Sequence, residues 1–372
     1  MKADSPYAAL LALSTALLGC NGSPTSPPAS SDSGSVAVVA EPEGDPLDVI
    51  EELKLVATNV KLDGNGFVTD VDFRGTAIDD ATLNQVASLE HVASLLLNDT
   101  SITDVGLEVV GQLKSLRNLD LRGCSVSNDG IAHLKGLHEL RALRLSGSTG
   151  ATTVDDGGMT SIGELTKLKA LALDFLWVSE DGLAELSKLK DLEELYLAKT
   201  LVGDDALPLL KQFPKLKKLR ISQTQVTSVG LAHVGALTTL EDLDLSENSQ
   251  IFDDGMKHLS GLVALKRLNL WRDALTDSGM EPLAGLTNME WLNVDNTQLT
   301  DAGLKHFQGM SNLVFLHVGS TAVSDAGLPD LEGLTSLKDL KVTRTAVTEE
   351  GVAKLKEKLP STEIQLKYIE GQ

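Results

Sequence analysis

Apolar and polar residues alternate in a short motif that recurs along most of the chain. In one copy the apolar residues Leu292 and Val294 are separated by Asn293, and Trp291 and Asp295 flank them. Leu292 and Val294 would point to one face of a strand, and the residues beside them to the other. This period of two predicts a short strand with one buried face. Farther along the same copy, Leu304, Phe307 and Met310 keep helical spacing and predict a helix that faces the same core. Each copy is therefore expected to run strand, corner, helix and return.

The first apolar residue of the strand segment recurs at a nearly constant interval. Its twelve positions are Val71, Leu95, Leu119, Leu143, Leu171, Leu195, Leu219, Leu243, Leu268, Leu292, Leu316 and Leu340. The interval is 24 residues, except for 28 after Leu143 and 25 after Leu243. A period in this range with leucines so arranged resembles the leucine-rich repeats, and we expect the four extra residues near 150–153 to form a protruding loop.

The resemblance covers about residues 68 to 366 and implies the fold. It is closest to the ribonuclease-inhibitor-like type and to the repeat arrays of planctomycete-type bacterial lipoproteins. It implies an α/β leucine-rich-repeat solenoid of horseshoe form, with about 12 repeats of 24 residues. A parallel sheet would line the concave side and helices the convex side.

Two further positions of the repeat have a physical interpretation. Thr297 belongs to a column of small polar residues at the strand-to-loop corner, where a hydroxyl can bond to backbone groups. Cys124 falls in this column and is expected to be a small buried residue rather than a nucleophile. Pairs such as Thr103-Asp104 predict a hydroxyl helix cap followed by a carboxylate near the positive end of the helix dipole. We therefore attribute much of the excess acid to helix starts.

The ends of a solenoid expose apolar surface that must be covered. Residues 46–67 are assigned to an N-terminal cap, because Leu47, Ile50, Leu53 and Ala57 keep helical spacing and a hairpin pattern follows. The repeats themselves are assigned to residues 68–359. Residues 360–372 are assigned to a C-terminal cap and tail, in which Ile364 and Leu366 would supply a final strand.

The chain begins with an export signal. Residues 1–19 contain a weakly positive start and a short apolar run, which fits a secretory signal peptide. Leu17-Leu18-Gly19-Cys20 resembles the bacterial lipobox, which implies a lipid on Cys20. Residues 20–45 are rich in Gly, Ser, Pro and acid and should form a disordered, lipid-anchored tether. We expect an exported protein anchored to the outer membrane, on its periplasmic side or at the cell surface. The reason is that Asn21 follows the cysteine, and in the enterobacterial sorting rule a residue other than Asp at this position favours the outer membrane.

Charge and chemistry exclude several functional classes. The chain has 53 acids against 32 bases and a net charge of -21, which argues against a nucleic-acid partner. Two cysteines build neither a disulfide framework nor a four-cysteine zinc site. His233 and His258 occupy the same helix position in adjacent repeats, but no Cys or carboxylate recurs beside them, so neither a metal nor another cofactor is expected. The sequence also contains no phosphate-binding loop, nucleophile elbow or zinc-protease motif, so no catalytic residue is assigned.

Function in a repeat protein usually lies in positions that vary between repeats. We define the concave columns as the residues one before, one after, three after and four after the first strand leucine. Nine are basic: Arg122, Arg144, Lys199, Lys218, Arg220, Arg267, Arg272, Lys341 and Arg344. Nine are acidic: Asp99, Asp120, Asp174, Glu194, Asp242, Asp244, Glu247, Asp295 and Asp339. The expected concave face is thus neutral in an acidic molecule.

The same columns concentrate aromatic residues in three consecutive repeats. The candidate contact patch, called the concave patch below, comprises Arg267, Asn269, Trp271, Arg272, Trp291, Asn293, Asp295, Phe315 and His317. Exposed aromatic rings beside arginine are enriched at binding hot spots. In the alternative interpretation, Trp291 and Phe315 only stack on each other to cover the sheet. A secondary patch comprises Phe175, Trp177, Tyr196 and Lys199.

These patterns favour a non-catalytic protein-binding module of the bacterial envelope, with its ligand on the concave face. The expected partner is a protein, or else an envelope glycan, with the membrane reached through the lipid on Cys20. One alternative is a structural, envelope-organising repeat protein that only self-associates. A remote alternative is a glycan-acting enzyme that uses carboxylates such as Asp242, Asp244 and Glu194.

Overall fold

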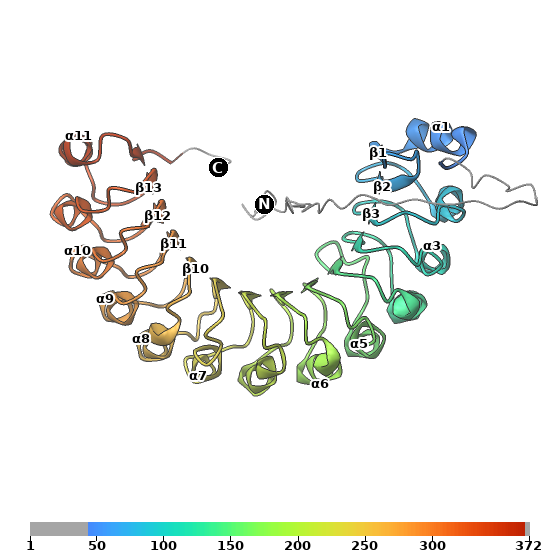
Figure 1. Cartoon of the computed structure of the whole chain (residues 1–372). Coiled ribbons are helices and arrows are strands. Elements are labelled where there is room, and N and C mark those ends of the chain that lie inside the picture. The colour runs from blue at the N-terminus through green and yellow to red at the C-terminus, as the bar shows by residue number, and fades with distance from the viewer. Residues whose placement is uncertain (1–43, 369–372) are drawn as a thin grey trace, which may run out of the picture. The chain divides into compact units, whose positions relative to one another are not determined.

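The computed structural model describes residues 44–368, so the expected signal peptide, Cys20 and most of the expected tether lie outside the described residues. Within this range one sheet of 14 strands follows the order of the sequence. The first pair of strands is antiparallel, and all later neighbours are parallel. Figure 1 shows the strands along the inner side of an open arc and the helices along its outer side. The expected leucine-rich-repeat solenoid is confirmed.

The strands are three to five residues long. They are β1 (Asn59–Leu62), β2 (Val68–Asp72), β3 (Ser94–Leu96), β4 (Asn118–Asp120), β5 (Ala142–Ser146), β6 (Ala170–Asp174), β7 (Glu194–Tyr196), β8 (Lys218–Arg220), β9 (Asp242–Asp244), β10 (Arg267–Asn269), β11 (Trp291–Asn293), β12 (Phe315–His317), β13 (Asp339–Lys341) and β14 (Glu363–Gln365).

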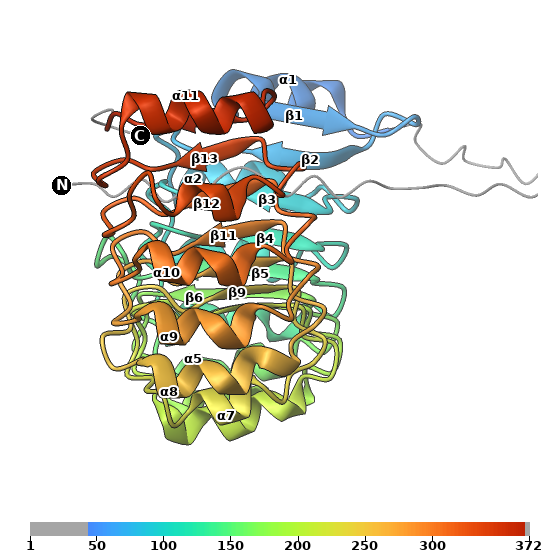
Figure 2. The same ribbon diagram turned by 90° about the vertical axis from the view of Figure 1, so that its left-hand side faces the viewer.

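The outer side combines α-helices with 3₁₀ segments. The α-helices are α1 (Leu47–Val56), α2 (Asp80–Leu83), α3 (Asp104–Val110), α4 (Asn128–Ala132), α5 (Asp156–Gly163), α6 (Glu180–Glu185), α7 (Leu231–Val234), α8 (Asp253–Met256), α9 (Asp277–Met280), α10 (Asp301–Leu304) and α11 (Glu349–Lys358). The 3₁₀ segments are η2 (Asn84–Val86), η3 (His133–Gly136), η4 (Leu186–Lys188), η5 (Asp204–Gln212), η6 (Lys257–Gly261), η7 (Glu281–Leu283), η8 (Lys305–Phe307) and η9 (Leu328–Leu331). In Figure 2 the outer segments of successive repeats lie side by side.

Two repeats differ from the expected pattern because they contain a 3₁₀ helix and no α-helix. These are η5, with Pro208 in its interior, and η9, with Pro329 in its first turn. Proline has no backbone N–H and its ring excludes the carbonyl four residues earlier, so it interrupts α-helical hydrogen bonding. The tighter 3₁₀ turn is then the short alternative. Leu207, Leu210 and Leu331 are still buried in these segments.

The leucine interval sets the strand register. The first apolar residues of neighbouring repeats pair directly across the sheet, as Leu268 does with Leu292 and Leu292 with Leu316. All twelve of these positions are at most 2% exposed. Because a change of one residue in register would turn each strand's apolar residues to the solvent, the buried leucines fix the register strongly.

Both ends of the sheet carry elements outside the regular repeats. The helix α1 buries Ile50 and Leu53, and β1 pairs with β2 as a hairpin. Leu47 was grouped with these residues by its helical spacing, but its side chain is 77% exposed because it opens the helix beyond the edge of the core. At the other end, β14 pairs with β13 and places Ile364 beside Leu340.

Asp79 and Asp155 cap their helices as expected, but most first-turn acids have a further role. Asp104 does not bond to the N–H groups of its own helix, whose cap is the Thr103 hydroxyl. Its carboxylate instead accepts hydrogen bonds from Ser127 in the next repeat, at 2.8 Å from the backbone nitrogen and 2.6 Å from the hydroxyl. The helix dipole acts within the first turn, whereas this contact joins residues 23 positions apart.

The polar column at the corner behaves as expected. The Thr297 hydroxyl donates to the carbonyl of Val294, three residues earlier, at 2.8 Å. Cys124 is fully buried in this column, and its thiol contacts the carbonyl of Leu97 at 3.1 Å. Burial raises the pKa of this thiol, which is the opposite of what a nucleophile needs. No helix within residues 44–368 is long and apolar enough to cross a membrane.

Candidate binding surface

The strand register gathers the residues of the concave patch. Neighbouring strands of a sheet are about 4.8 Å apart, so side chains at equivalent positions of adjacent repeats stack on one another. One row runs through Arg267, Trp291, Phe315 and Asp339 on β10 to β13. The parallel row is Asn269, Asn293, His317 and Lys341. The patch is therefore one continuous surface across β10 to β12, and both rows extend onto β13.

Four side chains of these rows form a layered stack, called the aromatic stack below. The rings of Trp291 and Phe315 lie 5.0 Å apart between centroids and 6° from parallel. Arg267 lies over Trp291 at 4.6 Å, and the Lys341 ammonium lies 5.7 Å from the centroid of Phe315. The stacking considered as an alternative is thus present. Because a ring or a cation lies on these faces, the half-buried rings offer mainly their edges to a partner.

The other members of the concave patch surround this stack. The Arg272 guanidinium lies 5.2 Å from the ring of Trp271 and pairs with Glu247 at 3.2 Å. Asn269 and Asn293 brace the corners, since each side-chain oxygen accepts a hydrogen bond from the backbone N–H two residues later. These amides therefore hold the backbone as well as lining the surface.

Most charges predicted for the concave face neutralise one another in pairs. Arg220 lies between two carboxylates, at 3.2 Å from Asp174 and 3.3 Å from Asp244. Arg267 approaches Asp242 at 3.4 Å. These pairs are partly buried, so they are screened less by salt than pairs in open solvent. The neutrality expected from the residue count thus extends to individual ion pairs.

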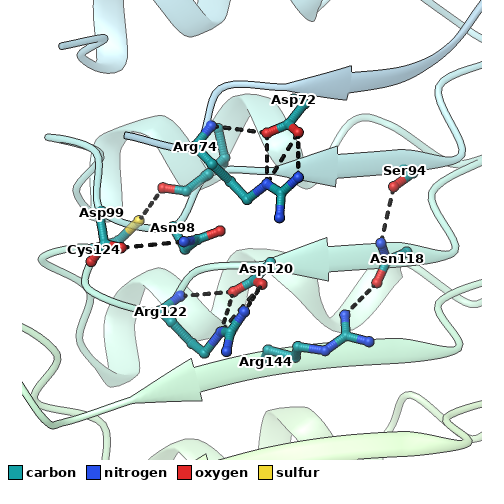
Figure 3. A network of polar contacts seen from close by, with 11 residues as sticks. Asp72, Arg74, Ser94, Asn98, Asp99, Asn118, Asp120, Arg122, Cys124 and Arg144 are labelled. Atoms are coloured by element: carbon teal, nitrogen blue, oxygen red, sulfur yellow. Dashed lines mark hydrogen bonds and ion pairs between the residues drawn. The ribbon is translucent and has the colours of Figure 1, made fainter. Parts of the chain in front are cut away.

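Figure 3 shows the same principle at the N-terminal end of the sheet. Asp120 accepts two hydrogen bonds from the Arg122 guanidinium, at 2.9 Å and 2.6 Å, and Asp72 holds Arg74 in the same way. Each carboxylate also accepts the backbone N–H of its arginine. A bidentate pair fixed to its own corner loses little freedom, which favours a stiff surface.

Four concave cations have no carboxylate within 4.0 Å among residues 44–368. They are Arg144, Lys199, Lys341 and Arg344. Arg144 donates to Asn118, and the other three lie over the rings of Phe175, Phe315 and Tyr368, respectively. Lys341 and Arg344 both belong to the β13 repeat, where Asp339 likewise has no cation within 4.0 Å among residues 44–368.

The carboxylates considered for catalysis are engaged in structure. Glu194 accepts the hydroxyl of Tyr196 at 2.9 Å and pairs with Lys218 at 2.8 Å. Burial and the charge of Glu194 raise the pKa of the Tyr196 hydroxyl. Burial raises the pKa of Asp242 to about 6, although Arg267 and Lys218 oppose the shift. These contacts account for the three side chains as parts of an ion-pair network.

The residues of the secondary patch occupy three different positions. Tyr196 lies in β7 on the concave face, and Phe175 and Lys199 lie at neighbouring corners, where the Lys199 ammonium is 5.4 Å from the Phe175 centroid. Both have a positive φ, 63° and 56°. Trp177 lies beyond the corner, is 76% exposed and makes no ring contact with the others in the described part of the chain.

Sequence reasoning did not single out Gly319 or Thr343, which face Asp295 and His317. A Cβ atom on Gly319 would lie within 2.8 Å of polar atoms from all three of these side chains. The sequence offered only one signal for this convergence, which is a glycine in a column where the adjacent repeats have Asp295 and Thr343. The lipidation expected at Cys20 lies outside the described residues.

Comparison with known proteins agrees with this architecture. The family described as leucine-rich repeat region matches residues 67–255, and no curated protein gives a significant match. An internalin (inlF) from Listeria monocytogenes is 20% identical, and the match covers 91% of this chain and 100% of that chain at a TM-score of 0.59.

Two further solved structures share the fold at a TM-score of 0.52. In the complex of Rad7 and Elc1 in yeast the matched chain is 20% identical, and the match covers 77% of this chain and 83% of that chain. In the octameric complex of Latrophilin 3, Unc5D and FLRT2 the matched chain is 18% identical, and the match covers 76% of this chain and 86% of that chain. Since the family match spans half of the sequence and the repeats continue beyond it in the same register, the chain belongs to the leucine-rich repeat family.

Proposed function

We propose that this chain is a non-catalytic protein-binding module whose ligand lies on the concave patch. The aromatic stack is the observation that carries the proposal. It presents two large rings and two cations on a sheet, at fixed spacing, and without a covering segment in residues 44–368. Aromatic and arginine side chains dominate binding energy at protein interfaces.

The stiffness of the surface supports the same function. Binding loses free energy when loops and side chains must become ordered, and a prearranged surface avoids much of that cost. Here the corners are braced by Asn269 and Asn293, and the charges are held in pairs. Two structures that share this fold are protein complexes, which agrees with a binding role.

The geometry disfavours an envelope glycan as the partner. Sugars pack against aromatic rings through the ring face, but Trp291 and Phe315 turn faces toward each other and toward Arg267 and Lys341. Protein side chains and backbone amides can contact ring edges, which carry the positive part of the quadrupole. A glycan-acting enzyme has still less support, because Glu194, Asp242 and Asp244 are held in ion pairs.

The test is affinity capture from envelope extracts with the full chain, compared with the variant Trp291→Ala/Phe315→Ala. We expect the double variant to lose a partner that the parent chain retains, and its melting temperature to fall only slightly because both rings lie outside the core. Phe252→Ala is the matched control, since it removes an exposed aromatic side chain outside both patches. Retention of every partner by the double variant would refute the proposal.

The same proposal includes an exported protein anchored by a lipid on Cys20, at the outer membrane or cell surface. The support is the lipobox-like Leu17-Leu18-Gly19-Cys20 and the resemblance to planctomycete-type lipoproteins. Metabolic labelling with palmitate should mark the parent chain and not Cys20→Ala. Equal label in both proteins would exclude the anchor without affecting the concave patch.

A further inference from the structure

Three polar side chains converge beside the aromatic stack, over a residue that has no side chain of its own. Gly319 stands between Asp295 and Thr343, which occupy the same position in the neighbouring repeats. An ideal Cβ on Gly319 would lie 2.7 Å from Asp295 Oδ1, 2.7 Å from His317 Nε2 and 2.8 Å from Thr343 Oγ1. We call Asp295, His317, Gly319 and Thr343 the Gly319 niche.

The side chains of the niche are mostly buried, but their polar atoms still reach solvent and receive no hydrogen bond from the described part of the chain. The exposed fraction is 14% for the Asp295 side chain, 21% for His317 and 5% for Thr343. Within residues 44–368 none of the three side chains forms a hydrogen bond, and Asp295 and His317 approach only to 3.7 Å. A ligand that reaches the niche can replace water at these atoms and supply their hydrogen bonds.

The donors and acceptors define what fits. The Asp295 carboxylate only accepts hydrogen bonds, whereas the Thr343 hydroxyl and an imidazole N–H can donate. Burial, assisted by Lys341, lowers the pKa of His317 despite the opposing charge of Asp295, so the imidazole is neutral at pH 7. A group that donates at one atom and accepts at a neighbouring atom, as an amide does, matches this arrangement. A carboxylate would face Asp295, and an ester would leave Asp295 without a donor.

We propose that the Gly319 niche binds an amide group of a peptide segment, with its N–H directed at Asp295 and its carbonyl at His317 and Thr343. This inference rests on the proposed protein-binding function and specifies the chemistry of the ligand. His317 lies edge-on to Phe315 at 6.4 Å, so the adjacent side chain of the peptide meets the aromatic stack. A sugar N-acetyl group also contains an amide, but the covered ring faces favour the peptide.

The experiment uses small probes and the full chain. The histidine ring signals are recorded by NMR during titration with 3-phenylpropanamide, and the His317 signal is assigned from the His317→Gln variant. Methyl 3-phenylpropanoate has the same size without an N–H, and N-acetylglucosamine carries an amide without an aromatic ring. We expect the amide probe to bind at least tenfold more tightly than the ester, and N-acetylglucosamine to leave the His317 signal unchanged.

Variants locate the site. Gly319→Ala places a methyl group among the three polar atoms and should abolish the response, and Thr343→Val should weaken amide binding about tenfold by removing one donor. Gly333→Ala is the matched control, because nothing lies within 4 Å of its added Cβ. Melting of each variant shows whether it folds, and Thr343→Val keeps the test valid if Gly319→Ala does not.

Equal binding of amide and ester, or full binding by folded Gly319→Ala and Thr343→Val, would overturn the inference. An equal response to N-acetylglucosamine would overturn its peptide part and favour a glycan. Failure of these probes leaves the capture experiment with Trp291→Ala/Phe315→Ala unaffected. Conversely, loss of the protein-binding proposal would leave the niche as a site for small amides only.

Discussion

Asp104 of one repeat and Ser127 of the next are joined by two hydrogen bonds, from the serine N–H at 2.8 Å and from its hydroxyl at 2.6 Å. The same contact recurs along the solenoid. The eight acid and hydroxyl pairs are Asp80 with Thr103, Asp104 with Ser127, Asp156 with Ser179, Asp204 with Thr227, Asp253 with Thr276, Asp277 with Thr300, Asp301 with Ser324, and Asp325 with Thr348. Each hydroxyl also accepts a backbone N–H two or three residues later, and we call this series of inter-repeat contacts the acid ladder.

Removing one of these carboxylates should destabilise the array. Asp104→Ala leaves the Ser127 N–H and hydroxyl without their charged acceptor, and hydrogen bonds to charged groups contribute about 1.5–3 kcal/mol each at most. We expect a loss of about 2–3 kcal/mol in the free energy of unfolding, measured by urea denaturation. Asp129→Ala is the control, since that acid is exposed and its side chain forms no hydrogen bond in the described structure. Equal stability of the two variants would contradict the ladder.

A glycine completes each of these contacts. The Asp104 carboxylate lies where a Cβ on Gly130 would be placed, three residues after Ser127. Gly130→Ala should therefore destabilise the fold by about 1–3 kcal/mol, despite the helical preference of alanine. The sharper test is a double-mutant cycle by urea denaturation. If the clash is with the carboxylate, Gly130→Ala costs clearly less in the Asp104→Ala background, and strict additivity would show that it is not.

The fold could be predicted almost completely because its signal is repeated. Leu268, Leu292 and Leu316 each occupy the same place in a short alternation, and burial of one face leaves no other register. The acid ladder could not be predicted in this way. Asp104 follows a capping hydroxyl, so the local pattern has a sufficient explanation, and nothing in it specifies a partner 23 residues later.

The sequence predicted which residues belong to the site, but not how their side chains stack and pair. Column positions placed Trp291 beside Phe315, but the choice between open rings and stacked rings depends on side-chain torsions that spacing does not encode. The same columns gave a neutral charge count without showing that Arg220 would lie between Asp174 and Asp244. Composition determines such sums, whereas pairing depends on distances.

The pair of Arg267 and Asp242 makes the concave face sensitive to pH. Burial raises the pKa of Asp242 to about 6, and Arg267 opposes this shift from 3.4 Å. Removing the positive charge by Arg267→Gln should raise the pKa of Asp242 further, as read from the carboxyl carbon signal by NMR. Lys305→Gln removes an equal charge from η8 on the outer side and should leave it unchanged. A lower pKa of Asp242 in Arg267→Gln would refute the assignment.

Asp273 should limit stability at neutral pH. It occupies the corner column, where its Oδ1 accepts the Asn248 N–H at 2.9 Å while its buried Oδ2 has no partner in the described structure. Burial raises its pKa well above 3.8, so between these values the folded protein binds more protons than the unfolded chain. The free energy of unfolding therefore falls as pH rises through that window.

Asp273→Asn should raise the free energy of unfolding at pH 7 by about 1–3 kcal/mol, because the amide keeps the acceptor and adds donors without a buried charge. Asn248 shows that the column accepts an amide, since its nitrogen donates to the carbonyls of Ile221 and Leu245. Thermal melting from pH 4 to pH 8 should give a flatter profile for Asp273→Asn than for the parent chain. Asp129→Asn changes an exposed acid and should keep the parent chain's slope of melting temperature against pH. If Asp273→Asn also kept that slope, Asp273 would already be charged at low pH.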